Sequence, residues 1–264
     1  MHPIIHLGSV EIPAYGLCMA IGIIVAFVLS YYRLRKKGEI IDSLLLVAAV
    51  AMIIGLCCAK IFYYVFSYGL GRLFREVFSG DFSGFQDSGL VYYGGLLGGI
   101  VGAFVAIKTN NLNFDNYVNA IVPCVPLGHA FGRIGCLMAG CCYGQPYEGV
   151  FAVHSVDLDP NLLLFPIQAV ESILNVLLFV VLIFFTKKER KGIATLAFYI
   201  VAYSVIRFIL EFFRGDLIRG VYAGLSTSQW ISILLIMLFL LLLRLHKIGH
   251  LKSLDSLSTD KGGA

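Results

Sequence analysis

Polar residues capable of chemistry stand inside stretches that are otherwise apolar. The stretch 126–144, PLGHAFGRIGCLMAGCCYG, places His129, Arg133 and three cysteines in such surroundings. A guanidinium at membrane depth costs about 2.5–3.5 kcal/mol on insertion scales, so we expect Arg133 to face a protein interior or a wet cavity. A cost of this size predicts a charged partner or a function for Arg133.

A second polar group lies on one face of the stretch 193–213. Tyr199, Tyr203, Arg207 and Glu211 recur every four residues, and Arg214 follows three residues later. Residues at this spacing share one helix face. One interpretation is structural, with the arginine and the glutamate neutralising each other.

The balance of charge favours a functional interpretation. Arg133, Arg207 and Arg214 outnumber Glu171 and Glu211, which leaves at least one guanidinium for an anion. Arginine binds phosphate through two parallel hydrogen bonds and stays charged when buried. The sequence therefore predicts a ligand that carries phosphate, such as a phospholipid headgroup.

Other polar residues are open to two interpretations. Gln168, Glu171 and Asn175 form one stripe, which either function or hydrogen bonding to a neighbouring helix would explain. Cys136, Cys141 and Cys142 lack the paired C-x-x-C spacing of a zinc site, so no metal is predicted. A disulfide between cysteines of this group is possible on the sequence alone.

The elements that must position these residues are membrane helices. The 264 residues are 59% hydrophobic and only 14% charged, with a mean hydropathy of +0.86, values that exceed those of a soluble domain. Apolar runs long enough to cross a bilayer lie near 14–32, 43–66, 89–107, 117–137, 166–186, 193–213 and 227–243. We expect an all-α, polytopic integral membrane protein with seven transmembrane helices.

Lysine and arginine in the connections predict the orientation. Thirteen lie on one side and four on the other, which places the N-terminus outside and the C-terminus in the cytoplasm. The net charge of +4 reflects this topology, and no nucleic-acid footprint is present. We expect a transmembrane domain over 1–250 with an outer arm at about 67–88, and a disordered cytoplasmic tail over 251–264.

Several motifs along the chain resemble one known family. GHAFGRIGCLMAGCCYG is similar to the signature of the phosphatidylglycerol–prolipoprotein diacylglyceryl transferases, and PAYGL, VYYGGLLGG, FPIQAVES, RFILEFFRGD and LSTSQW extend the resemblance. The resemblance implies a multi-pass enzyme of the bacterial plasma (inner) membrane that acts in lipoprotein maturation. It would transfer diacylglyceryl from phosphatidylglycerol to the lipobox cysteine of a prolipoprotein signal peptide, forming a thioether. It implies no metal and no organic cofactor.

The resemblance also assigns roles to residues. Arg133 and Arg207 would be catalytic, with Tyr15, Gly144 and Glu211 supporting them. The chemistry also needs a base, for which the sequence offers Glu211 or Tyr93. The predicted substrate-binding residues are Tyr15, His129, Cys136, Gly144, Gln168, Glu171, Tyr203, Arg214 and Gln229. The chain departs from the family where it has Tyr93 for a histidine and Cys136 for an asparagine.

These departures keep two alternatives open. A paralogous membrane enzyme could use the same arginines for a different acceptor, with cysteines taking part in the chemistry. A transporter or lipid-binding protein is the other alternative, but transporters place polar groups at the midplane and often contain two related halves. Here the polar groups gather near one face, and the chain has no internal repeat.

Overall fold

The computed structural model describes residues 4–7, 10–69, 92–154, 162–215 and 221–241, together with Gly71, Arg75 and Ser79. Helices dominate the described residues, in agreement with the all-α prediction. The chain forms two compact units, one of residues 31–117 and the other of residues 1–30 and 118–264.

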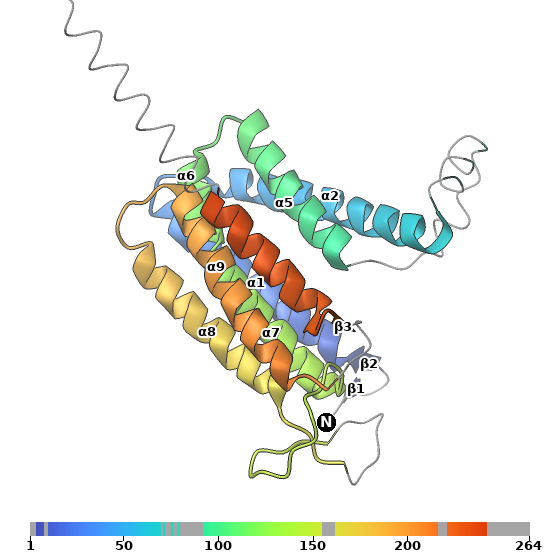
Figure 1. Cartoon of the computed structure of the whole chain (residues 1–264). Coiled ribbons are helices and arrows are strands. Elements are labelled where there is room, and N and C mark those ends of the chain that lie inside the picture. Colours follow the sequence, from blue (N-terminus) through green and yellow to red (C-terminus); the bar gives the residue numbers. More distant parts are fainter. Residues whose placement is uncertain are drawn as a thin grey trace, which may run out of the picture. The chain divides into compact units, whose positions relative to one another are not determined.

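The unit of residues 31–117 contains two long helices that run side by side, α2 (Ile41–Tyr68) and α5 (Tyr92–Thr109) (Figure 1). Glycines of α5 allow this close approach. A Cβ atom on Gly94 would lie 2.7 Å from the carbonyl oxygen of Cys58, and one on Gly102 would lie 2.9 Å from Cα of Ala51. Small residues let helix backbones meet where lipid gives no hydrophobic drive to association.

The other unit is a helix bundle (Figure 1). It contains residues 14–30 of α1 (Ala14–Arg35), α7 (Cys124–Ala139), α8 (Ile167–Phe185), α9 (Gly192–Leu210) with the short 3-10 helix η1 (Glu211–Phe213), and the helix Thr227–Leu241. Helix α8 packs against both α7 and α9. These three helices carry most of the predicted site residues.

Glycines also set the crossing of α1 and α7. A Cβ on Gly22 would lie 2.9 Å from the carbonyl oxygen of Gly128, and one on Gly135 would lie 3.1 Å from Cβ of Cys18. Helix α7 ends at Gly140, which has φ 75°. Glycine adopts this left-handed conformation without a steric penalty, so it terminates the helix.

The expected helix over 117–137 lies within one candidate span, Phe114–Ala139, which is interrupted between α6 (Phe114–Ile121) and α7. The break falls at Val122 and Pro123. Proline lacks an N–H, and its ring clashes with the carbonyl four residues earlier, so Pro123 interrupts the helix. Pro126 is tolerated in the first turn of α7, where the N–H groups have no helical partner.

Two short hairpins were not predicted. Strand β1 (Ile4–Leu7) pairs antiparallel with β2 (Val10–Pro13), and β3 (Val221–Tyr222) pairs with β4 (Leu225–Ser226). In the second hairpin Ala223 and Gly224 have φ 51° and 78°. Two consecutive positive φ values are typical of the tight turns that connect β-strands.

Five helices in the described part of the chain are long and apolar enough to cross a membrane: Ala14–Arg35, Ile41–Tyr68, Phe114–Ala139, Ile167–Phe185 and Gly192–Phe213. Gly94–Thr109 and Thr227–Leu241 are shorter apolar helices. Seven spans and the orientation of the termini therefore stay predictions. Most of the expected arm at 67–88, and the whole tail at 251–264, lie outside the described residues.

Candidate active site

The carboxylate of Glu171 is the centre of the arginine cluster. Glu171 lies on α8, and its side chain is only 1% exposed. Arg133 of α7 places Nη2 at 2.9 Å from Oε1, and Arg207 of α9 places Nη1 at 4.0 Å from Oε2. Two guanidinium groups from separate helices therefore converge on the two oxygens of one buried carboxylate.

Arg207 has two further partners. Its Nη2 lies 2.7 Å from Oε2 of Glu211, which is one helical turn further along. The same Nη2 donates a hydrogen bond to Oγ of Ser228 at 3.2 Å. Glu211 and Ser228 thus hold one edge of the guanidinium, while its buried Nη1 makes no hydrogen bond within the described part of the chain.

His129 and Tyr203 line the other side of Arg133. Arg133 donates a hydrogen bond from Nε to Nε2 of His129 at 3.2 Å, and this Nε2 lies 3.7 Å from Oε1 of Glu171. The rings of His129 and Tyr203 have centroids 5.4 Å apart. Because Nε2 accepts a hydrogen bond it carries no proton, so the imidazole is neutral.

Each glutamate of the cluster lies against an arginine. Arg133 and Arg207 each have an acidic partner, so these four groups balance. Arg214 is buried and lies beside Cys142.

Gln168 and Gln229 are both buried and engaged by backbone groups. Gln168 donates from Nε2 to the carbonyl of Cys141 at 2.8 Å. Gln229 accepts a hydrogen bond from the N–H of Ser226 at 2.9 Å, and its own N–H donates to Oγ of Ser226 at 3.2 Å. This reciprocal pair is a capping box at the start of the last helix. Both glutamines therefore have a structural role next to the cluster.

Gly144 lies where three backbone segments meet. A Cβ atom there would be 2.5 Å from the carbonyl oxygen of Phe165 and 3.1 Å from that of Phe213. Gly144 also forms a β-bridge with Arg214. Close packing of the backbone accounts for this glycine, although the sequence resemblance assigned it to substrate binding.

Two predicted tyrosines lie at helix starts. Tyr15 near the start of α1 is 44% exposed, and it packs against α7, where a Cβ on Gly135 would lie 3.2 Å from its Cα. Tyr93 is the second residue of α5, in the unit of residues 31–117, and its side chain lies outside the described part. A catalytic role for Tyr93 stays a prediction.

The sequence analysis did not identify Ser228 as a site residue, and it did not predict that three cysteine sulfur atoms lie together. Ser228 lies in the motif LSTSQW and binds Arg207, but the motif alone does not say which residue faces α9. The sulfur atoms of Cys136, Cys141 and Cys142 all lie within 4.8 Å of one another. The signal that predicts this convergence is the glycine between Cys136 and Cys141, which closes the helix and turns the chain back.

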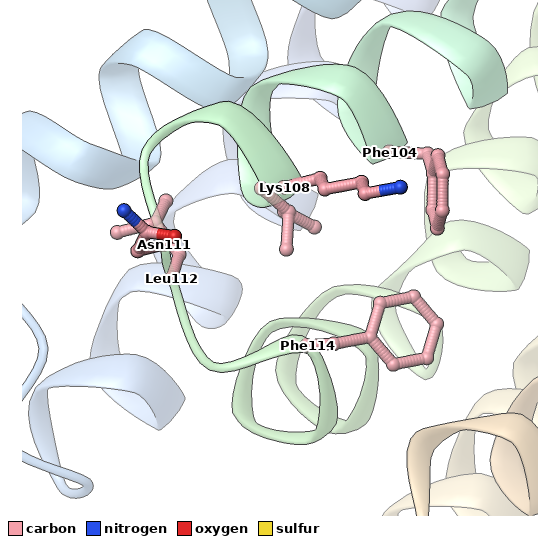
Figure 2. A pocket seen from close by; sticks show the side chains of 6 residues that line it. Phe104, Lys108, Asn111, Leu112 and Phe114 are labelled. Carbon is pink, nitrogen blue, oxygen red and sulfur yellow. The ribbon is translucent and has the colours of Figure 1, made fainter.

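A pocket in the unit of residues 31–117 has different chemistry. Figure 2 shows it between the end of α5 and the start of α6, with a volume of about 370 Å³. Its lining residues are Phe104, Ile107, Lys108, Asn111, Leu112 and Phe114. Lys108 is its one charged residue, and none of the six is an acid, a thiol or a hydroxyl. The arginine cluster is the better candidate for an active site.

Known proteins resemble this chain along nearly its whole length. Residues 2–245 match the family model described as prolipoprotein diacylglyceryl transferase. A phosphatidylglycerol–prolipoprotein diacylglyceryl transferase of Clostridium tetani (strain Massachusetts / E88) is 33% identical over 242 residues, 90% of this chain and 95% of that protein. A second such protein, from Clostridium perfringens (strain 13 / Type A), is 32% identical over 91% of this chain and 93% of its own length. A third, from Clostridioides difficile (strain 630), is 30% identical over 80% of this chain and 82% of its own length. The chain therefore belongs to the prolipoprotein diacylglyceryl transferase family.

Proposed function

We propose that this protein transfers the diacylglyceryl group of phosphatidylglycerol to the thiol of the lipobox cysteine in a prolipoprotein. Its relatives carry this activity in their names. The observation that carries the proposal is the meeting of Arg133 and Arg207 at Glu171 within an apolar helix bundle. We further propose seven spans in the bacterial plasma (inner) membrane, with the N-terminus outside.

The reaction is a displacement at a glycerol carbon of the lipid. The cysteine sulfur of the prolipoprotein forms a C–S bond, and the C–O bond to the phosphate breaks. Glycerol phosphate leaves with the electron pair of the C–O bond, and the thiol proton passes to a base. The site must therefore stabilise negative charge on the departing phosphate and assist in forming a thiolate.

The arginines supply the first requirement. Each guanidinium has five N–H donors in a fixed plane. Arg207 uses Nη2 for Glu211 and Ser228, so its Nη1 edge is the donor for a phosphate oxygen. In this proposal Glu171 is a positioning residue, because one carboxylate holds two like-charged groups in place before the lipid arrives.

His129 is the proposed base. Its Nε2 carries no proton and its side chain is 20% exposed, and in this proposal the thiol replaces the Nε–H of Arg133 as the donor to Nε2. Glu211 is less available as a base in this geometry because its Oε2 is engaged by Nη2 of Arg207 at 2.7 Å. In this proposal His129 takes the role for which the sequence alone left Glu211 and Tyr93 as candidates.

The proposal is tested with purified protein, phosphatidylglycerol and a synthetic lipobox peptide. We expect the peptide to gain the mass of one diacylglyceryl group, with release of one glycerol phosphate per adduct. A matched peptide with serine in place of the cysteine should gain nothing. Folded protein that yields no adduct would overturn the proposal.

The cysteine cluster favours a second candidate function. A related enzyme could use the same arginines with one of its own thiols as an acceptor, since three sulfur atoms lie together near Arg133 and Arg214. Such an enzyme would carry lipid on its own chain after incubation with phosphatidylglycerol alone. The mass of the intact protein decides between the two candidates.

A further inference from the structure

The cysteines at the end of α7 are brought together by the way the helix ends. The N–H of Cys141 donates to the carbonyl of Cys136 at 3.2 Å, and the N–H of Gly140 donates to the carbonyl of Leu137 at 3.3 Å. This pair of bonds is a Schellman motif, in which the first and sixth residues face one another. Cys136 and Cys141 occupy these two positions, and Cys142 follows directly.

The backbone of Cys142 is held in an uncommon conformation. Its φ is 59°, in the left-handed region that non-glycine residues rarely adopt. The following residues fix it, because Gly215 donates a hydrogen bond from its N–H to the carbonyl of Tyr143 at 3.1 Å and Gly144 bridges to Arg214. Strained residues of this kind occur at functional sites more often than elsewhere.

The surroundings of Cys142 favour its thiolate. A hydrogen bond from the Cys136 thiol and the nearby guanidinium of Arg214 lower the pKa of Cys142 to about 5, although burial opposes this shift. The thiolate is the nucleophilic form of cysteine. A thiolate that accepts a hydrogen bond from a second thiol has its partner for disulfide formation already in place.

We propose that Cys136 and Cys142 form a reversible disulfide, and that this pair is a modification site whose oxidant is a low-molecular-weight or protein disulfide. The proposal does not depend on the transferase activity, because it concerns the covalent state of the chain. The convergence of the three sulfur atoms within 4.8 Å of one another and the turn after α7 that brings them together carry it.

The oxidation proceeds in two exchanges. The Cys142 thiolate attacks one sulfur of the external disulfide, forms a mixed disulfide and releases one thiolate. That thiolate takes the proton of the Cys136 thiol, and the Cys136 sulfur then attacks the Cys142 sulfur and releases the second thiolate. Two protein thiols are oxidised and one external disulfide is reduced to two thiols, the second proton coming from water.

A metal site is the competing use of three thiols. Among the described residues no histidine or carboxylate joins the three sulfur atoms. Arg214 lies beside Cys142 and would repel a cation. A metal site is therefore the less favoured possibility, and the experiment below includes a measurement of bound metal.

The test uses the full-length protein in detergent, first reduced and then exposed to oxidised glutathione. Remaining thiols are blocked by alkylation, and the protein is digested with chymotrypsin. Cleavage after Leu137 and Tyr143 separates Cys136 from the other two cysteines. A disulfide to Cys136 therefore joins two peptides, with the loss of two hydrogen atoms from their summed mass.

We expect the joined peptides in the native protein and in the Cys141→Ser variant, and their loss in Cys142→Ser. Cys57 and Cys58, which are adjacent on α2, serve as the internal control and should stay alkylated. Joined peptides that persist in Cys142→Ser would overturn the assignment of Cys142. Fully alkylated cysteines after exposure to glutathione, or one zinc ion per chain in the protein as purified, would overturn the disulfide proposal. Size-exclusion profiles of both variants show whether each is folded.

Discussion

Replacing Arg207 with lysine separates a phosphate-binding role from simple charge pairing. Arg207 contacts Glu211 and Ser228 through Nη2 and directs Nη1 toward Glu171. A lysine ammonium is a single point of charge, so it can keep the 2.7 Å contact with Glu211 while the Nη1 donor is lost. The variant therefore keeps the structural ion pair and removes the proposed phosphate contact.

The expected loss follows from the removal of one preorganised donor. Deleting a donor that stabilises a developing oxyanion costs about 2.7–4 kcal/mol, a fall of about 100- to 1,000-fold in turnover. We expect this fall for Arg207→Lys in the peptide assay, with yield and elution from size exclusion unchanged. The matched control is Arg190→Lys, because Arg190 is an exposed arginine that bonds the Phe185 carbonyl at 2.9 Å, outside the cluster.

One result would refute the reasoning about Arg207. If Arg207→Lys transfers diacylglyceryl at the rate of the Arg190→Lys control, the Nη1 edge does not stabilise the departing phosphate. Arg207 would then serve only to pair with Glu211. A variant that is inactive but also aggregated does not answer the question, and Arg207→Gln with measured folding then provides the second test.

Three further predictions concern the surroundings of the cluster. Glu171→Gln leaves two buried guanidiniums facing an uncharged group, and we expect it to destabilise the folded protein by about 3–5 kcal/mol. Thermal unfolding measures this loss, and Glu148→Gln, at an exposed position, is the control. Gly144→Ala places a Cβ at 2.5 Å from a backbone oxygen, so it should lower the melting temperature, whereas Gly16→Ala, which meets nothing within 4 Å, should not. Because the pKa of Cys142 is lowered to about 5, nearly all of this thiol is ionised at pH 6 and above. We therefore expect the rate of Cys142 alkylation, followed by mass spectrometry, to be constant from pH 6 to 8. An alkylation rate that falls tenfold for each unit of decreasing pH would contradict this.

Hydropathy predicted where the helices lie but not which faces they bury. Helix α1 buries Gly22 and exposes Ile23 and Ile24, the reverse of a helix in a soluble protein. In lipid, apolar side chains are satisfied on any face, and close packing selects small residues instead. The glycines of a membrane helix therefore carry the information about its contacts that apolar periodicity carries elsewhere.

The residue types of the cluster were predictable, and their pairing was not. Spacing places Arg207 and Glu211 on one face, but it does not show that Glu171 of another helix lies between Arg133 and Arg207. That contact depends on how α8 packs between α7 and α9, which involves residues far apart in the sequence. Counting charges likewise ignores where each carboxylate lies, so it did not show that Arg133 pairs with Glu171 and Arg207 with Glu211.

A carboxylate at the centre of a proposed phosphate site has a physical reason. Two guanidiniums from different helices repel one another, and burial in a poorly polarisable interior strengthens that repulsion. Glu171 offsets it by placing negative charge between them, 2.9 Å from Nη2 of Arg133 and 4.0 Å from Nη1 of Arg207, so the donors hold their places before a lipid is bound. The phosphate then meets donors that need little rearrangement, which is the condition under which electrostatic stabilisation lowers a barrier most. Glu171 thus links the stability of the bundle to the proposed chemistry, and no variant at this position is expected to alter one without the other.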